Sequence, residues 1–356
     1  MALFEVKDSD RRIYEEEIRD FLPDRIIDIH THLWLRELRR EKAGDPIMTR
    51  RTVTWPSMVA ADNSVEDLQE TYRLLFPGKE VVPLLFSNPR SLEDLGPQND
   101  YVRDSARKTG YPALYWSVPG QSADEVEAQI RAGGYLGIKG FQTFSAGYIP
   151  AKEIRIFDFF PKHQLKRMDE LGAIVMLHIP RDGRLKDPVN LAQICEIKEE
   201  FPNLKLIVAH IGRAYTREDI GNAFEVLAPY RDLLFDFSAN CSEHALYELF
   251  RNVGPDRALF GSDMPILRMR NHRIEENGTY INLVPKGLYG DVSGDRHMRE
   301  VDGEEAKTIT FFMYEEVLAA KRAAKRMGFG KEEIEKIFCG NSARLLAEAE
   351  KSIYGK

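Results

Sequence analysis

Cysteine is scarce in this chain of 356 residues, which contains three: Cys195, Cys241 and Cys339. They lie far apart and form no C-x-x-C pair, so we expect neither a cysteine zinc site nor a redox-active dithiol. A low, odd count is typical of a reducing compartment. The first residues, MALFEVKDSDRR, carry charges too early for a secretory signal. The sequence therefore predicts a cytoplasmic protein.

Long hydrophobic runs and a basic surplus are also missing. No apolar run reaches the roughly 18 residues that a membrane helix needs. The 50 basic and 57 acidic side chains leave a net charge of −7, which argues against nucleic acid or an anionic membrane as a partner. There is no internal repeat and no low-complexity segment. With 43% hydrophobic and 30% charged residues, the composition is that of a globular protein with a large core.

Short apolar runs recur with a regular spacing along the chain. Each is rich in β-branched or aromatic residues, as parallel strands covered on both faces are. We predict strands at 26–32, 81–87, 113–118, 136–141, 173–179, 205–211, 233–238 and 258–263. Helical patterns fill the gaps, for example at 64–76, which opens with Ser64, and at 122–134, which opens with Ser122 and stops at a glycine pair.

Eight strands that alternate with helices predict an α/β fold, a (β/α)8 or TIM barrel. An open doubly wound sheet is the rival, but its G-x-G-x-x-G turn is missing after the first strand. We expect one barrel unit over 1–356, with a helical extension at 1–24. Further helices are predicted at 216–230 and 313–328, and a final one at 341–355 with Asn341 as its N-cap.

Two segments are longer than a barrel requires, 33–63 after the first strand and 264–305 after the eighth. Both leave the end of the barrel where active sites of this fold lie, and long ordered loops are usually functional. We expect them to form walls or a lid, with a short hairpin or flap within 264–305. A subunit contact is the alternative.

Five polar residues of types that bind metals stand at the ends of four predicted strands. His30 and His32 end the first strand, and His178, His210 and Asp263 end the fifth, sixth and eighth. The carboxyl ends of barrel strands meet at one mouth, and residues two apart in a strand point the same way. One strand-end histidine is more often a hydrogen-bonded core residue. Five such residues together predict a catalytic metal site with an open position for water.

The remaining histidines lack such a pattern. His163 and His244 lie in predicted helices and are expected to be surface or packing residues. His272 and His297 lie in the long segment after the eighth strand and could face the site.

Five short motifs resemble the amidohydrolase superfamily, and most closely its amidohydrolase-related branch, which also holds decarboxylases and lactonases. They are DIHTH, MLHIP, IVAHIGR, LFGSDMP and GNSARLL, and the resemblance runs from about Arg25 to Leu346. It implies that one divalent ion, zinc or else manganese, is bound by His30, His32, His178 and Asp263. It also implies that His210 lies beside the ion and polarises the substrate or helps to move protons.

Lys139 leaves a second arrangement open, a site with two metal ions. Other branches of the superfamily carry a carboxylated lysine on strand four that bridges two ions, and His178 and His210 would then bind the second ion. The surrounding motifs favour the one-metal plan, in which Lys139 stays an amine near the substrate.

The predicted chemistry is hydrolysis of a carbon–oxygen or carbon–nitrogen bond in a lactone, ester or amide, with Asp263 and His210 as catalytic residues. Basic residues after the ligands suit a carboxylated small-molecule substrate. Arg181, Arg213 and Lys139 are the best candidates, with Arg184, Arg268 and Arg270 also close in sequence, and Trp34, Trp116 and Phe141 as possible walls. Alternatives are non-oxidative decarboxylation on the same site and a binding protein without turnover. We also expect a homo-oligomer, most simply a dimer.

Overall fold

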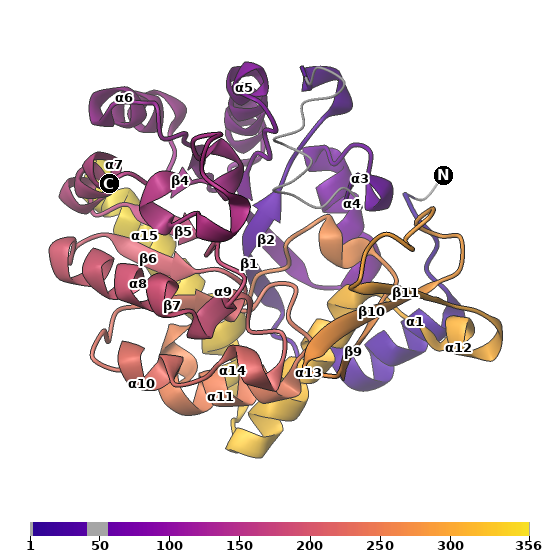
Figure 1. Cartoon of the computed structure of the whole chain (residues 1–356). Coiled ribbons are helices and arrows are strands. Elements are labelled where there is room, and N and C mark those ends of the chain that lie inside the picture. Colours follow the sequence, from indigo (N-terminus) through magenta and orange to yellow (C-terminus); the bar gives the residue numbers. More distant parts are fainter. Residues whose placement is uncertain (1–2, 41–55, 356) are drawn as a thin grey trace.

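The computed structural model describes residues 3–40 and 56–355, and all structural statements refer to these residues. Eight parallel strands follow one another along the chain, each followed by helical segments (Figure 1). The strands are β1 (Arg25–His32), β2 (Glu80–Phe86), β3 (Tyr115–Trp116), β4 (Gly137–Lys139), β5 (Ile174–Leu177), β6 (Lys205–Val208), β7 (Leu234–Asp236) and β8 (Ala258–Leu259). Each lies at one of the eight predicted places, although most end earlier than predicted.

The eight strands close into a ring. β1 pairs with β2, and β3 to β8 form a six-stranded parallel sheet in chain order. A parallel bridge from Leu85 to Ala113 joins β2 to the start of that sheet, and a bridge from Thr31 to Met264 joins its end to β1. The amide of Ile29 also donates to the carbonyl of Phe260, at 3.0 Å. The predicted (β/α)8 barrel is therefore confirmed.

The helices around the ring begin at the predicted caps. The Ser64 hydroxyl accepts from the Asp67 amide at 3.0 Å, and Ser122 caps the next predicted helix in the same way. The principal helices are α4 (Val65–Leu75), α5 (Leu92–Thr109), α6 (Ala123–Gly133), α7 (Lys162–Leu171), α8 (Pro188–Glu200), α10 (Ala223–Leu227), α11 (Glu243–Val253), α13 (Phe312–Met327), α14 (Lys331–Glu335) and α15 (Asn341–Tyr354).

Two helix predictions need correction. The helix predicted over 216–230 is divided into a short turn, Arg217–Asp219, and α10. Asn341 is not an N-cap, because α15 continues directly from a π-helical turn, Lys336–Gly340. The Asn341 side chain instead donates to the carbonyls of Pro255 and Ala258, at 2.7 and 3.0 Å. It thus fastens α15 to the start of β8.

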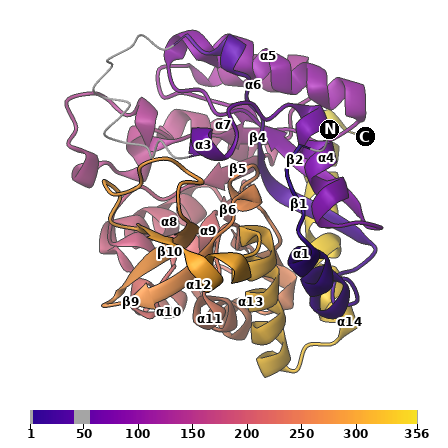
Figure 2. The ribbon, with the colours of Figure 1, turned by 90° about the vertical axis from the view of Figure 1, so that its right-hand side faces the viewer.

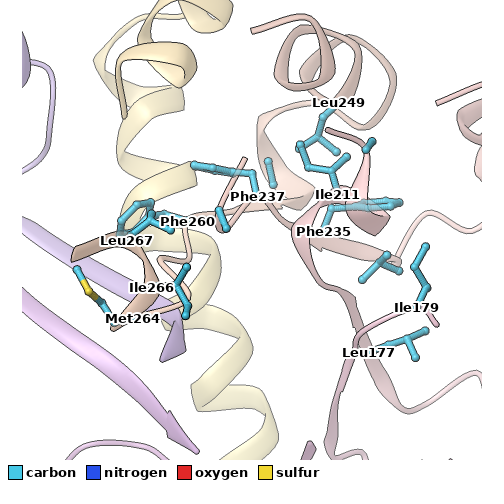
Figure 3. Packing of buried hydrophobic residues seen from close by; sticks show 14 of the residues in the cluster. Leu177, Ile179, Ile211, Phe235, Phe237, Leu249, Phe260, Met264, Ile266 and Leu267 are labelled. Atoms are coloured by element: carbon cyan, nitrogen blue, oxygen red, sulfur yellow. The ribbon is translucent and has the colours of Figure 1, made fainter. Parts of the chain in front are cut away.

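The core has an inner and an outer part because alternate strand residues face opposite ways. Ile174 and Met176 of β5 belong to a cluster with Leu345 of α15, inside the barrel. Val175 and Leu177 belong to the larger cluster between the strands and the helices. Figure 3 shows part of this outer cluster, in which the ring centroids of Phe237 and Phe260 are 5.9 Å apart.

The N-terminal segment is helical, as predicted, and comprises α1 (Asp8–Ile13) and a π-helical turn, Tyr14–Ile18. In both views α1 lies beside α13 (Figures 1 and 2). The Tyr14 ring stacks on Tyr314 of that helix at 6.2 Å. No helix in the described ranges combines the length and the apolar character that crossing a bilayer requires.

The long segment after β8 forms a small sheet of its own. It contains β9 (His272–Glu276), β10 (Thr279–Pro285) and β11 (Met298–Val301) in the order β11-β10-β9, and α12 (Gly303–Thr308) follows. β9 and β10 form an antiparallel hairpin, whose turn residues Asn277 and Gly278 both have positive φ. The hairpin expected within 264–305 is therefore present (Figure 2).

Candidate metal centre and cavity

In both His30 and His32 of β1, the ring nitrogen Nδ1 has a hydrogen-bond partner. His30 Nδ1 lies 2.9 Å from Oδ2 of Asp236, and His32 Nδ1 lies 3.1 Å from the carbonyl oxygen of Ser87. Both partners are acceptors, so Nδ1 carries the proton in each ring. Nε2 then keeps its lone pair, as a neutral metal-binding imidazole requires.

Asp263 faces both of these nitrogens. Its Oδ1 lies 3.6 Å from Nε2 of His30 and 3.3 Å from Nε2 of His32. Ligands that surround zinc tetrahedrally at 2.0–2.1 Å are roughly 3.3 Å apart, so this separation fits one ion. The backbone amide of Asp263 donates to the carbonyl of His30 at 2.8 Å, which ties the end of β8 to β1. These three residues form a group that could hold a divalent ion.

The charge state of Asp263 suits a ligand. Burial alone would raise its pKa, but the adjacent His32 side chain and the nearby imidazoles of His210 and His30 lower the pKa to about 2. The carboxylate is therefore ionised at neutral pH, as metal binding requires.

His178 lies just beyond β5 and lines the same cavity, but it is outside the close group of three. Its ring centroid is 5.3 Å from that of His210 and 4.7 Å from that of Phe141. Its Nδ1 is buried without a hydrogen-bond partner among the described residues. Burial, with the charge of Arg213, holds the pKa of His178 well below its usual range. A neutral ring with an unpartnered nitrogen fits the predicted fourth ligand.

His210 is fixed from behind by the loop after β7. Its Nδ1 lies 2.9 Å from the carbonyl oxygen of Ser238, and its amide donates to Oδ1 of Asp236 at 2.9 Å. Its Nε2 is left for the cavity, which His210 lines. Burial lowers the pKa of His210 to about 4, so the ring is neutral at pH 7.

The backbone around His210 is unusual. Four successive residues, from His210 to Arg213, have φ between 52° and 60°, which makes a left-handed turn. This conformation is costly for a β-branched residue such as Ile211. Asp263 and Ala239 also have positive φ. Such strain concentrates at functional sites that the surrounding structure holds in place.

Asp236 is a site residue that the sequence analysis missed. It is fully buried at the end of β7 and accepts hydrogen bonds from His30, His210 and Ser238. Burial alone would raise its pKa, but His30 first, then His210 and Ser238, hold the pKa below its usual range. A signal was present, since Asp236 ends an apolar strand just as the predicted ligands do.

Lys139, at the end of β4, lines the cavity and is 2% exposed. Its Nζ lies 5.8 Å from the ring centre of Phe86 and 6.0 Å from that of Trp116. Burial lowers its pKa to about 8, against the opposing charges of Asp236 and Asp263. Among the His, Cys, Asp and Glu side chains of the described residues, a second group that could hold an ion is formed by His30, His210 and Asp236, and His178 belongs to neither group.

The cavity at the barrel mouth has a volume of about 560 Å³. It is lined by the predicted aromatic residues Trp34, Trp116 and Phe141. The segment after β8 contributes Ile266, Arg273, Tyr280, Asn282, Asp295 and His297 to the lining. This segment therefore forms part of the cavity wall. Of the other long segment, 33–63, Trp34 lines the cavity, whereas residues 41–55 lie outside the described part of the chain.

The predicted arginines are divided by the structure. Arg213 lines the cavity, and its Nη1 donates to the carbonyl of Pro180 at 3.1 Å. The other four are not among the lining residues. Arg181 pairs with Asp187, Arg184 with Asp219 and Arg270 with Asp10, and Arg268 donates to the carbonyl of Val59.

A different arginine, Arg273 of β9, lines the cavity without having been singled out. It belongs to the hairpin, where no sequence motif marks it. His163 and His244 form hydrogen bonds near the surface, as expected. His272, which could have faced the site, pairs with Glu315 and is not among the lining residues. His297 lines the cavity and stacks on Tyr280, with ring centroids 4.2 Å apart.

Solved structures with this fold are distant in sequence. An amidohydrolase from Burkholderia multivorans with bound zinc has a TM-score of 0.57 and 14% identity, over 90% of this chain and 99% of that chain. A dihydroxybenzoic acid decarboxylase from a Polaromonas species, with manganese and the inhibitor 2-nitroresorcinol, has a TM-score of 0.54 and 16% identity, over 93% and 100%. A putative 2-pyrone-4,6-dicarboxylic acid hydrolase from Pseudomonas putida has a TM-score of 0.53 and 15% identity, over 92% and 98%.

These likenesses establish the fold. No curated protein sequence matches the chain. The family model described as Amidohydrolase matches residues 27–279, well over half of the chain, and this range contains both the histidines and Asp263. The protein therefore belongs to the amidohydrolase family.

Proposed function

We propose that this protein is a metal-dependent hydrolase that cleaves a carbon–oxygen or carbon–nitrogen bond in a small carboxylated substrate. The observation that carries the proposal is the group formed by His30, His32 and Asp263, with both imidazoles protonated on the far nitrogen and an ionised carboxylate between them. One divalent ion would be held there, with His178 as the fourth ligand. The zinc of the Burkholderia structure and the manganese of the Polaromonas structure support either metal.

A bound divalent ion supplies Lewis acidity and lowers the pKa of water towards 7. The protein's own groups supply the proton movements. The Asp263 carboxylate accepts a proton from the attacking water and then donates this proton to the leaving group. Nε2 of His210 carries no proton in the neutral ring, because Nδ1 donates to the carbonyl of Ser238, so it would accept and return a proton near the reacting carbonyl rather than donate to its oxygen.

The cationic side chains of the cavity support a carboxylated substrate. Lys139 and Arg213 line it together with the candidate ligands, and neither forms an ion pair among the described residues. An unpaired cation in a cavity is a favourable partner for a carboxylate. We propose that these two residues orient the substrate. Arg181 is a weaker candidate, because Asp187 already occupies its guanidinium.

A second candidate is non-oxidative decarboxylation. It is favoured by the same unpaired cations, which could hold a carboxylate next to Asp263. The fold is found both in a dihydroxybenzoic acid decarboxylase and in a putative pyrone dicarboxylic acid hydrolase, so it is compatible with either chemistry.

Metal analysis of the purified protein, followed by a substrate screen, tests the proposal. We expect about one divalent ion per chain and activation of chelated protein by zinc or manganese. Lactones, esters, amides and carboxylated phenols are then screened, with acid release and carbon dioxide release measured in parallel. Acid release supports hydrolysis, and carbon dioxide release supports the second candidate. Metal content near zero without activation by added ions contradicts both, and two ions per chain would indicate a carboxylated Lys139.

A further inference from the structure

Arg273 stands in the cavity wall in an aromatic setting. Its guanidinium carbon lies 4.8 Å from the ring centre of Tyr215, 4.6 Å from that of Tyr280 and 4.6 Å from that of Phe312. All three rings also line the cavity. Rings on several sides restrict the side chain to one orientation, so its position does not depend on a bound ligand.

Two of its donors are used by the protein. Nε donates to Oδ1 of Asn282 at 2.9 Å, and Nη1 donates to the carbonyl of Ala239 at 2.6 Å. Both partners are neutral, and no carboxylate among the described residues lies within ion-pair distance. Arg184, which contacts the same two tyrosine rings, is paired with Asp219. Arg273 therefore keeps an uncompensated charge at the cavity, with Nη2 not engaged.

The anchor of Arg273 relates it to the metal centre. Ala239, which accepts from Nη1, directly follows Ser238, whose carbonyl holds Nδ1 of His210. Arg213 is fixed to the loop after β5 instead, by the carbonyl of Pro180. The two guanidiniums thus have separate anchors in one cavity.

The charge balance of the lining favours anions. Besides Arg90, which interacts with other residues, four cationic side chains line the cavity, Lys139, Lys152, Arg213 and Arg273, together with three carboxylates, Asp182, Asp263 and Asp295. One of the three, Asp263, belongs to the metal group, and a divalent ion would add two further positive charges. A substrate with a single carboxylate leaves this excess largely uncompensated.

We infer that Arg273 binds a second anionic group of the substrate, remote from the reacting bond, and so selects a dianion, most simply a dicarboxylate. This rests on the proposed function for the identity of the reacting site. The second carboxylate would accept from Nη2, while Asn282 and the three rings keep the guanidinium in place. A neutral group at this position would leave a cavity arginine without its anion.

Binding of two inert probes tests the inference. Benzoate carries one carboxylate, and isophthalate carries two on the same ring, which suits the aromatic walls. We expect calorimetry to show that isophthalate binds the wild-type protein at least about tenfold more tightly than benzoate, the factor expected of a charge-assisted hydrogen bond. Arg273→Met should remove this preference and leave benzoate affinity within about twofold. Arg273→Lys should restore part of it, because lysine keeps the charge but lacks the fork.

Arg299→Met is the matched control. Arg299 lies on β11 of the same small sheet, pairs with Glu276 at the surface and does not line the cavity. This variant should bind both probes as the wild type does. If Arg273→Met does not fold, Arg273→Lys carries the test, with a preference for isophthalate smaller than that of the wild type as the expected result. Equal binding of the two probes by the wild-type protein, or an equal loss of both in the Arg273 variants, overturns the inference.

The measurement is made on metal-free and on zinc-loaded protein. The proposed function fails if the protein binds no ion and turns over no substrate. The preference between the probes is still measurable in that case, so the two failures are distinguishable.

Discussion

Each central histidine whose Nδ1 has a partner presents Nε2 to the cavity. For His30 and His210, the β7 strand and the loop after it provide the partners, through Asp236 and Ser238. The metal ligand His30 and the proposed proton-transfer residue His210 are thus oriented by the same short stretch of chain. Ligand orientation by hydrogen bonds of this kind commonly tunes a metal site.

Asp236→Asn should weaken metal binding. The amide keeps the shape but removes the charge that orients His30 and raises its basicity. We expect the affinity for zinc to fall roughly 10–100-fold, as for other partners of metal-binding histidines. Competition with a chromogenic chelator measures this. Asp20→Asn, at an exposed carboxylate of the N-terminal segment, is the control and should leave zinc affinity unchanged. Unaltered affinity in Asp236→Asn would contradict the orienting role.

His210→Asn should separate chemistry from metal binding. We expect the metal content to stay near the wild-type value, since His210 forms a group with His30 and Asp236 and does not belong to the group that His30 forms with His32 and Asp263. Turnover should fall roughly 10²–10⁴-fold, the usual contribution of a positioned acid–base group. Elemental analysis and steady-state kinetics measure the two effects, with His163→Asn as a surface control. Loss of the metal would instead identify His210 as a ligand.

The principal candidate ligands could be predicted from residue type and position alone. Histidines two apart on a strand must share a face, and strand ends of a barrel must converge. Arg273 could not be found in this way, because its place depends on the hairpin folding back over the mouth. Arg181 and Arg270 were predicted to face the cavity because they are close in sequence to a ligand. Both side chains instead pair with aspartates and do not line the cavity.

At the scale of elements, the strands were predictable from apolar runs, but their ends were not. Residues after β6 and β8 keep an apolar sequence while the backbone leaves the sheet. Ile211 is the clearest case, because a β-branched residue predicts an extended strand and here has φ of 52°. The left-handed turn is imposed by the surrounding packing and by the bond from the His210 amide to Asp236. Tertiary contacts therefore override the local preference.

The start of the long segment after β8 is anchored by a buried ion pair. Nη2 of Arg270 lies 2.7 Å from Oδ2 of Asp10, and both side chains are nearly inaccessible. Arg270→Met should lower the free energy of unfolding by about 3–5 kcal/mol, because the Asp10 carboxylate is left buried without its partner. Urea unfolding measures the change.

Arg299→Met is again the comparison, since its exposed pair with Glu276 is worth about 1 kcal/mol or less. The double variant Asp10→Asn with Arg270→Met should recover part of the loss, because no charge remains buried. A stability equal to that of the wild type in Arg270→Met would show that the pair is not needed to hold the segment.

At the scale of the whole molecule, a buried carboxyl group below the metal centre makes stability depend on pH. Asp28 of β1 accepts from the Tyr72 hydroxyl at 2.6 Å and from the Ser262 amide at 2.8 Å. Burial raises its pKa from 3.8 to about 7. Between about pH 4 and 7 the folded protein therefore holds a proton at Asp28 that the unfolded chain has lost. This contribution to stability is present at low pH and is lost as the pH rises through 7.

Asp28→Asn should remove that dependence, because the amide cannot titrate and retains an oxygen for the backbone amides of Ser262 and His30, which both donate to Oδ1 of Asp28. In chelated protein, the wild type should gain about 2–3 kcal/mol relative to the variant between pH 8 and pH 5, since each pH unit is worth about 1.4 kcal/mol per proton. Urea unfolding of both proteins at the two values measures it. A constant difference would show that Asp28 is ionised in the folded state.

The homodimer remains a prediction, which light scattering tests.

The Asp10 carboxylate also accepts a hydrogen bond from the Thr310 hydroxyl, at 2.7 Å. It therefore binds both Arg270 and Thr310, the residues on either side of the segment that contains β9 to β11. Asp10, near the start of the chain, thus stabilises both ends of the segment between Arg270 and Thr310, which forms part of the cavity wall. Local opening of this wall would release α1 as well, and the two would behave as a single cooperative unit. In amide hydrogen exchange, α1 and the β9–β11 sheet would then become unprotected together, ahead of the barrel strands that carry the histidines.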